Sequence, residues 1–558
     1  MPTIKLNKER VLKLIGKKIS DEELTQRIPY LGTDLEEVNL TEIVVEIFPN
    51  RPDLLSEEGF ARALSSFLEI NKGLKKYEAK KSNYKVVIEK EVSSIRPYTA
   101  CAVIKNLELD EQKIEDLINI QEKLHITYGR NRKRCAIGIY PMEAIKFPIK
   151  YTALSPEKIK FVPLEKNKPM TAKEILEKHE KGKEYSHLLL GKEKYPVFID
   201  SNKEILSMPP IINSEKTGKI TTDTKDVFLE CSGYEFHIVS KAVNMIVSAM
   251  TDMGGETYQV ELNYPDKKIN SPQLEPEEIL VEKYYVEKYL GLILNNDELI
   301  KCLKKMGFDA EIQKTKIKVK IPPYRTDIIH SIDVVEDIAI GYGFDKIPIN
   351  NKRAQTTSKE SFKEKLKSKI KDILISHKFL ETSTYALISL EKQKENPDKE
   401  NDEEIVIIKN SISSEFNSLR KNMLISLLDV AELNKRYNYP QNYFEIGRVF
   451  KNNKNKDTGV EEKNILGIIM CSEYSGFTQA KQILDNILNS LNISYNLERN
   501  TNNYFIEGRT GNIIVQKENV GLIGELNPEI ITKRGIIVPI SYLELDFDKI
   551  EELIKEKI

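Results

Sequence analysis

The chain has 558 residues, which is too long for one hydrophobic core and predicts roughly three to five domains. Its 85 lysines and arginines balance 86 aspartates and glutamates, so no overall positive field draws nucleic acid to the surface. The five cysteines have no metal-binding spacing, which argues against a zinc site and a disulfide framework. No apolar run approaches the length of a membrane span, and we expect a cytoplasmic protein without a membrane or DNA partner.

Residues 1–85 are predicted to form a small α+β unit. Ser20 begins a Ser-x-x-Glu capping box, and Gly16 and Gly32 are typical residues for the ends of helices. The proline-rich sequence at 48–54 favours a rigid turn. The expected elements are helices at 8–15, 20–32 and 57–68 and a strand at 41–48.

A second segment repeats this pattern. The stretch 23–36 matches 298–311 with every spacing kept, including the glycine that ends each helix before a strand. One interpretation is a pair of related α+β modules, the second at 270–348. The other is the general chemistry of helix-to-strand connections, in which glycine is common.

A larger α+β unit is predicted at 86–268, with strands at 98–107 and 195–200. Inside the module at 270–348, residues 316–321 alternate lysine with apolar residues, which favours a half-buried edge strand.

Residues 355–558 are predicted to form an antiparallel α+β domain, because strands dominate and helices lie between them. The polar run 391–404 favours a disordered loop. The expected helices are 364–377 and 479–491, and the expected strands are 382–388, 405–409, 443–450, 464–472, 512–517, 520–526 and 541–546.

An acidic cluster lies in the second small module. Asp333, Glu336 and Asp337 stand at helical spacing on one face, and Asp327 precedes the helix. Exposed carboxylates at this spacing are often only a solvated face. The alternative is a metal site, because oxygen donors with no cysteine nearby suit Mg²⁺.

The sequences PPYRTD (322–327), GYGFDKIP (341–348) and NRPDLLS (50–56) resemble segments of the beta subunit of phenylalanine–tRNA ligase. In that family the acidic positions hold a magnesium ion shared with the alpha subunit, and ATP is a substrate of the complex. The resemblance implies that the magnesium ligands are Asp327, Asp333, Glu336 and Asp337.

The C-terminal domain resembles a class II aminoacyl-tRNA synthetase core at 418–424, 443–450 and 521–528. An adenylate-forming site needs arginines on the α- and γ-phosphates. Glu445 follows Phe444 where the first arginine is expected, and no glycine triplet precedes a second one. We interpret this domain as a synthetase-like scaffold that is catalytically inactive.

The unit at 86–268 resembles the editing domain of archaeal and eukaryotic-type beta subunits, in the segments 195–200, 205–214 and 223–233. Editing hydrolyses tyrosine mistakenly joined to the tRNA, which is needed where a pocket does not fully reject a hydroxyl. The resemblance implies that Ser207 and Glu230 hydrogen-bond the tyrosine hydroxyl and that Ser232 orders a water or the ester.

Two positions depart from the expected editing pattern, which has Asp and Thr where this chain has Glu230 and Ser232. In the alternative interpretation, these polar side chains are structural groups on an inner strand whose hydrogen bonds are already satisfied. The basic run 130–134 predicts either a tRNA contact or a solvated face.

From these resemblances the chain is identified as a member of the phenylalanine–tRNA ligase beta subunits of the short archaeal or eukaryotic-like type. The family implies an alpha2-beta2 complex that attaches phenylalanine to tRNA(Phe), with synthesis on the alpha subunit and hydrolysis of tyrosyl-tRNA(Phe) on the beta subunit. A stand-alone deacylase of mischarged tRNA and a non-catalytic tRNA-binding scaffold remain as alternatives.

Overall fold

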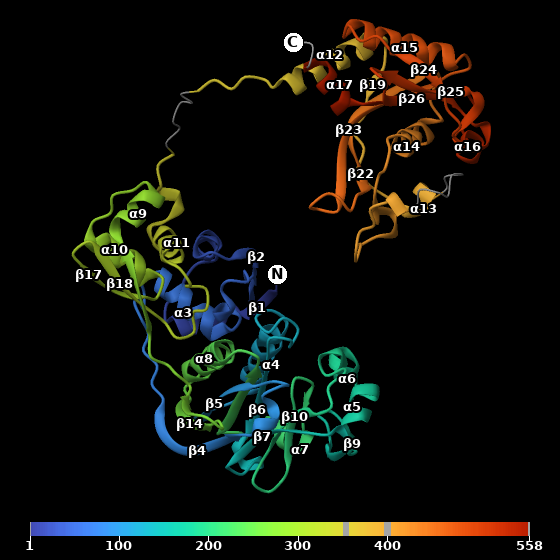
Figure 1. Cartoon of the computed structure of the whole chain (residues 1–558). Helices are drawn as coiled ribbons and strands as arrows, with labels where there is room; N and C mark the ends of the chain where they lie inside the picture. The colour runs from blue at the N-terminus through green and yellow to red at the C-terminus, as the bar shows by residue number, and fades with distance from the viewer. Residues whose placement is uncertain (1, 350–355, 395–402, 556–558) are drawn as a thin grey trace. The chain divides into compact units, whose positions relative to one another are not determined.

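The computed structural model describes residues 2–349, 356–394 and 403–555. The chain divides into two compact units, residues 1–351 and 352–558, each with its own cores (Figure 1). Both units combine helices with sheets, as predicted for a multidomain α+β protein.

The first module is a three-stranded antiparallel sheet in the order β1-β3-β2 with helices. Its helices begin at polar caps, because Asn7, Ser20 and Ser56 each accept a hydrogen bond from a backbone N–H of the first turn. The second helix ends sooner than predicted, because Pro29 begins a short 3₁₀ turn. The elements are β1 (Thr3–Asn7), α1 (Lys8–Ile15), α2 (Asp21–Arg27), β2 (Asp34–Val38), β3 (Glu42–Glu46) and α3 (Glu57–Phe67).

A second module repeats the same order of elements and the same sheet order, β16-β18-β17. The predicted pair of related modules is therefore confirmed. Its elements are β16 (Glu277–Glu282), α9 (Lys283–Leu290), α10 (Asn296–Lys305), β17 (Asp309–Gln313), β18 (Lys316–Ile321) and α11 (Ser331–Tyr342).

The prediction of an edge strand at 316–321 was wrong, because β18 is the central strand of this sheet. Its apolar side chains are buried on one face, which explains the alternation. The lysines on the other face remain compatible with a central strand, since Lys316 and Lys318 pair with glutamates of β16 and Lys320 pairs with Glu311 of β17.

Between these modules lies a sheet of ten strands in the order β12-β11-β10-β7-β4-β14-β5-β13-β6, with β15 beside β14. It begins at Lys80 and ends at Ser271, a few residues outside the predicted limits of 86 and 268. The strands are β4 (Lys80–Ile88), β5 (Tyr98–Lys105), β6 (Cys135–Pro141), β7 (Ile149–Leu154), β10 (Tyr195–Ile199), β11 (Ile205–Met208), β12 (Ile212–Asn213), β13 (Val227–Gly233), β14 (Glu256–Asn263) and β15 (Lys268–Ser271).

The long helix α8 (Phe236–Asp252) packs on β5 and β13 of this sheet, with α4 (Glu111–Ile126) nearby (Figure 1). A single apolar core runs from the first module through α8 into the second module. Ion pairs reinforce the joints: Arg10 of α1 contacts Asp116 of α4, and Arg62 of α3 contacts Asp252 at the end of α8. This core therefore joins both small modules to one face of the ten-stranded sheet.

The C-terminal unit is a seven-stranded sheet in the order β19-β22-β23-β27-β26-β25-β24. Only the short edge strand β19 pairs in parallel, so the prediction of an antiparallel domain is confirmed for the described residues. The strands are β19 (Leu380–Glu381), β22 (Gln441–Asn452), β23 (Val460–Cys471), β24 (Asn496–Arg499), β25 (Phe505–Val515), β26 (Glu518–Leu526) and β27 (Ile540–Asp546).

Separate apolar clusters lie around this sheet. One includes residues of α12 (Phe362–Ser376), α15 (Phe477–Ser490) and α17 (Phe547–Lys555). The other includes residues of α14 (Leu424–Asn434).

Three local predictions for this unit were wrong. Instead of one strand at 382–388 there are two short ones, β19 and β20 (Leu387–Ile388). At 405–409 the backbone forms only an isolated bridge at Ile407. The predicted loop at 391–404 contains part of a short helix, α13 (Leu390–Lys394), and its residues 395–402 lie outside the described ranges.

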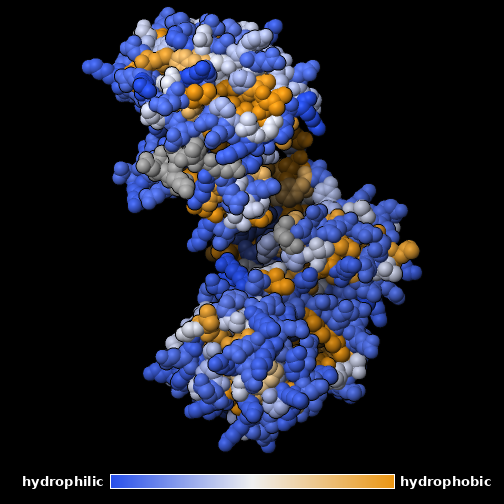
Figure 2. Space-filling view, turned by 90° about the vertical axis from the view of Figure 1, so that its right-hand side faces the viewer, coloured by the Kyte–Doolittle hydropathy of each residue, from blue (hydrophilic) through white to orange (hydrophobic). Residues whose placement is uncertain are grey.

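Hydrophilic side chains cover most of the face shown in Figure 2, where apolar side chains form separate patches. Among the helices in the described ranges, none has both the length and the apolar character to span a bilayer.

Candidate functional site

Glu230 lies in the middle of β13, with Cys101 of β5 and Gly138 of β6 as its direct neighbours across the sheet. Its side chain is buried, and the Tyr140 hydroxyl donates a hydrogen bond of 3.0 Å to Oε1. The same hydroxyl lies 3.3 Å from Asn213 Oδ1. A Cβ at position 138 would overlap both the hydroxyl and Oε1, so this glycine makes room for the pair.

Burial raises the pKa of Glu230 to about 8, although the Tyr140 hydrogen bond and the charge of Arg96 act in the opposite direction. The carboxyl group is therefore neutral over much of the physiological range. Its Oε2 is buried and has no hydrogen-bond partner in the described part of the chain. A buried polar atom of this kind is ready to bond a ligand.

Burial raises the pKa of Tyr140, and Ser207 on β11 lies close enough to the phenol to oppose this rise, although its buried Oγ completes no well-formed hydrogen bond among the described residues. The structure thus brings the predicted pair Ser207 and Glu230 together around one tyrosine hydroxyl.

Ser232 is placed differently. It is fully buried, and its Oγ accepts a hydrogen bond of 3.1 Å from Nε of Arg96. Nη2 of the same arginine donates to the Ser232 carbonyl at 2.7 Å. The structure gives Ser232 a role in holding a buried arginine and does not place it with the residues that line the neighbouring cavity.

A cavity of about 570 Å³ opens beside Glu230. Its volume falls within the range of small-molecule pockets, and its lining is largely apolar. Glu230 supplies a polar group on its wall. The apolar lining includes Ile114, Ile137, Ile139, Pro210 and Ile211.

Sequence reasoning missed several residues of this wall. Arg132 is buried, and its guanidinium donates to the Ile211 carbonyl at 2.7 Å and to Glu122 at 2.8 Å. His125 accepts a hydrogen bond from the Ile137 backbone N–H, and burial lowers its pKa to about 4. Tyr140, which donates to Glu230 but is not among the residues that line the cavity, stands two residues after Gly138 and therefore faces the same side of the strand.

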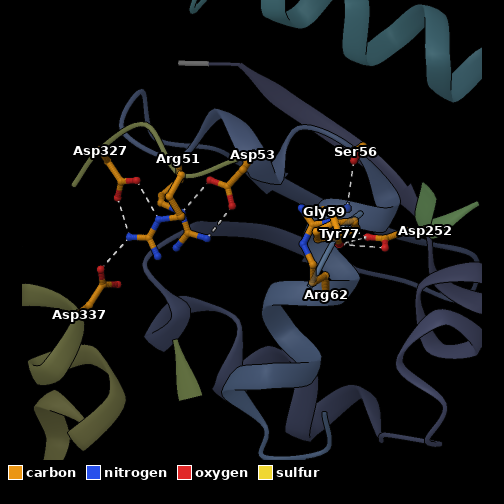
Figure 3. A network of polar contacts seen from close by, with 10 residues as sticks. Arg51, Asp53, Ser56, Gly59, Arg62, Tyr77, Asp252, Asp327 and Asp337 are labelled. Carbon is orange, nitrogen blue, oxygen red and sulfur yellow. Dashed lines mark hydrogen bonds and ion pairs between the residues drawn. The ribbon is translucent and has the colours of Figure 1, made fainter. Parts of the chain in front are cut away.

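The acidic residues of the second module meet a buried arginine. Arg325 binds Asp327 through two hydrogen bonds of 2.8 and 2.7 Å, and its Nη2 also contacts Asp337 at 2.7 Å. Burial raises the pKa of Asp337 to about 6 despite this arginine. Figure 3 shows Asp327 and Asp337 pointing toward guanidinium nitrogens beside Arg51.

Asp333 and Glu336 lie apart from that pair. Asp333 accepts hydrogen bonds from the backbone N–H groups of Ile329 and His330, and so caps α11. Glu336 is exposed. Across residues 2–349, 356–394 and 403–555, no three His, Cys, Asp or Glu side chains are grouped to hold a metal ion. The four predicted ligands of this chain therefore do not by themselves fit Mg²⁺.

The first module carries a matching arginine–aspartate pair. Arg51 binds Asp53 through hydrogen bonds of 2.9 and 2.8 Å, with the same Arg-x-Asp spacing as Arg325 and Asp327. The two guanidinium groups lie near enough that Arg325 opposes the charge of Arg51. In both modules the pair follows the third strand and precedes the last helix, so the repeated turns meet at the joint between modules.

In the C-terminal unit, Glu445 occupies the position at which an arginine for the α-phosphate is expected. It binds Arg420 at 2.9 Å, and both side chains are buried. Arg420 also donates to the Thr384 hydroxyl at 2.7 Å. A Cβ at Gly447 would overlap Arg420, so the chain packs tightly around this pair. The arginine is already bound to a carboxylate and is not free for a phosphate.

Known sequences match this arrangement along the chain. Models of the Phe-tRNA synthetase beta subunit B1 domain, the B3/4 domain, the tRNA synthetase B5 domain and the phenylalanyl tRNA synthetase beta chain CLM domain match residues 1–70, 84–249, 279–344 and 347–547. A phenylalanine–tRNA ligase beta subunit of Pyrococcus furiosus is 39% identical over 98% of this chain and 99% of its own. The chain belongs to the phenylalanine–tRNA ligase beta-subunit family.

Two further comparisons agree. The beta subunit of Methanosphaera stadtmanae is 34% identical over 99% of this chain and its own full length. The crystal structure of an N-terminal fragment of the beta subunit of Pyrococcus horikoshii is 43% identical, with a TM-score of 0.59, over 61% of this chain and 99% of the fragment. The predicted family is confirmed, and the chain is an archaeal-type subunit of a phenylalanine–tRNA ligase. The cavity lies in the part that matches B3/4, the editing domain of the family.

Replacing Arg325 tests the joint between the modules. Arg325→Met leaves Asp327 and Asp337 without their counter-ion, and we expect the free energy of unfolding to fall by about 3–5 kcal/mol. Chemical and thermal unfolding measure this loss. Lys316→Met, which breaks only an exposed pair with Glu282, should change it by less than about 1 kcal/mol. Equal losses in the two variants would contradict a dominant role for the buried arginine.

Glu230→Gln tests the buried carboxyl group. Between the ordinary pKa of 4.5 and the folded value of about 8, the unfolded state releases a proton that the folded state keeps. The stability of the wild type therefore falls as pH rises through this window, whereas Gln does not titrate. We expect the free energy of unfolding of Glu230→Gln, relative to that of the wild type, to rise between pH 5 and pH 8 by on the order of a few kcal/mol. A difference that stays constant with pH would contradict a raised pKa.

Proposed function

We propose that this subunit hydrolyses tyrosyl-tRNA(Phe) in the cavity beside Glu230, while its assembled enzyme joins phenylalanine to tRNA(Phe) with ATP. The observation that carries the proposal is Glu230, which lines a largely apolar cavity and whose buried Oε2 has no hydrogen-bond partner among the described residues. An aromatic ring fits the apolar lining, and a tyrosine hydroxyl supplies the missing hydrogen bond. Phenylalanine would leave that buried oxygen unpaired, which favours tyrosine.

Tyr140 and Ser207 support this selectivity. The Tyr140 hydroxyl occupies Oε1, so only Oε2 remains for a ligand. Ser207 of β11 lies close to the same hydroxyl. Ser232 acts through Arg96 in this proposal and does not touch the ester.

We propose that synthesis depends on an alpha subunit in an alpha2-beta2 complex. The support is that Glu445 stands at the expected phosphate position of the C-terminal sheet and is paired with Arg420, so that neither side chain is free to hold a phosphate. This domain, at about 355–558 in the proposed division, then serves as a synthetase-like scaffold for assembly.

A magnesium ion shared with the alpha subunit remains a proposal for the assembled enzyme. Asp327 and Asp337 are engaged by Arg325, and Asp333 caps its helix. The exposed carboxylate of Glu336 is the group of this chain most open to a site completed by a partner.

The assay is single-turnover hydrolysis of tyrosyl-tRNA(Phe) by the chain assembled with its alpha subunit. Glu230→Ala and Ser207→Ala should each lower the preference for tyrosyl- over phenylalanyl-tRNA, by about 10- to 100-fold for Glu230→Ala, since a buried hydrogen bond is lost. Glu193→Ala, at an exposed position of the same unit, is the matched control. Unchanged preference in Glu230→Ala would contradict the proposed pocket.

The same assay separates the alternatives. Hydrolysis by the beta chain without the alpha subunit would favour a stand-alone deacylase. Binding of tRNA without any hydrolysis would favour a scaffold that has lost editing.

A further inference from the structure

The turn between α4 and β6 has an unusual backbone. Three consecutive residues, Arg130, Asn131 and Arg132, have positive φ angles of 49°, 53° and 60°. Residues other than glycine adopt this left-handed conformation at an energetic cost, and such strain persists where the surrounding structure enforces it, often at ligand-binding sites.

Hydrogen bonds hold this turn rigid. The backbone N–H groups of residues 130–134 all donate to carbonyl groups of the turn or of the end of α4. Arg132 points inward and is fixed to the Ile211 carbonyl and Glu122 on the wall of the cavity. The side chains of Arg130 and Lys133, in contrast, are exposed on the outside of the turn.

The outward cations have no acidic partner. Arg130, Lys133, Arg134 and Lys267 form no ion pair with any described residue, whereas basic groups elsewhere in this unit, such as Lys80, Lys150 and Lys216, do. Glu235 and Asp266 are the exposed carboxylates in the adjoining sequence, so positive charge predominates. Unneutralised cations on a rigid turn are suited to phosphate groups.

Aromatic rings lie among these cations. Tyr98, Gly233 and Cys135 are aligned across β5, β13 and β6, so the ends of these strands meet at one edge of the sheet. Next to them, Tyr234 is 43% exposed, and the Lys267 ammonium lies 6.0 Å from the Tyr98 ring. Exposed rings combined with cations are typical of surfaces that bind single-stranded nucleic acid.

We propose that the turn 130–134, together with Tyr234, Tyr98 and Lys267, binds the single-stranded RNA that leads to the aminoacylated 3′ end. This inference rests on the proposed editing function. The turn carries cations on its outer side and a cavity-lining arginine on its inner side, so RNA held outside would deliver its esterified end toward Glu230. Because the net charge of the whole chain is only −1, the attraction for RNA comes from this local group of cations.

The experiment measures binding of uncharged tRNA(Phe) to the assembled enzyme at several salt concentrations. In Arg130→Glu/Lys133→Glu we expect the dissociation constant to rise at least tenfold. The slope of its logarithm against log salt should fall by about 1.4, because two phosphate contacts to a single strand are lost. The control is Lys194→Glu/Lys203→Glu, which makes the same charge change at exposed, unpaired positions of the same unit.

A second pair of variants tests stacking. Tyr234→Ala should weaken binding by about 5- to 100-fold, and Tyr234→Phe should retain it, because a phenyl ring also stacks on a base. Equal affinity and salt slope in the wild type and the charge-reversed variant would overturn the proposal.

The outcome is independent of the editing assay. A lowered preference for tyrosyl-tRNA in Glu230→Ala, with tRNA binding unaffected by the changes at 130 and 133, would support the proposed function and reject this surface. Weakened binding in Arg130→Glu/Lys133→Glu, with no hydrolysis even by the wild type, would support the surface and reject the editing function.

Discussion

Pairing of buried charges shapes both units of this protein. Arg325 has almost no exposed surface and binds two carboxylates, and Arg420 binds Glu445 in a similarly dry environment. A buried ion pair costs desolvation energy and is a weak source of net stability, but removing one partner is strongly unfavourable. These arginines therefore specify which acidic groups stay together and which remain available to a ligand.

The repeated modules show this constraint most clearly. Each places an Arg-x-Asp turn between its third strand and its last helix, and the two turns meet beside the shared core. Asp327 and Asp337 consequently act as internal counter-ions. In the ten-stranded sheet the Tyr140 hydroxyl satisfies one oxygen of Glu230, a residue of the cavity wall, and the other oxygen has no hydrogen-bond partner among the described residues. A carboxylate bound by an arginine is structural, whereas one with an oxygen that lacks a partner is available to a ligand.

Much of the fold follows from local sequence signals. Capping residues such as Ser20 and Ser56 and the matching spacing of 23–36 and 298–311 predicted elements that the structure contains. The edge-strand prediction for 316–321 was wrong because alternation reports one buried face and says nothing of the number of neighbouring strands. At the candidate site, the family resemblance predicted Ser207 and Glu230, whereas their neighbours Tyr140 and Arg96 depend on contacts between distant segments. Such long-range pairing has no local pattern.

The central claim is that this subunit contributes to the ligase without an adenylate-forming site of its own. Phenylalanine-dependent exchange of pyrophosphate into ATP tests it most directly, with the beta chain alone and then co-expressed with an alpha subunit from the same genome. The account predicts no exchange by the chain alone and full exchange by the mixture, eluting at the size of a tetramer. Exchange catalysed by the chain alone would contradict it, because Glu445 stands where the α-phosphate arginine is expected and its carboxylate is bound to Arg420.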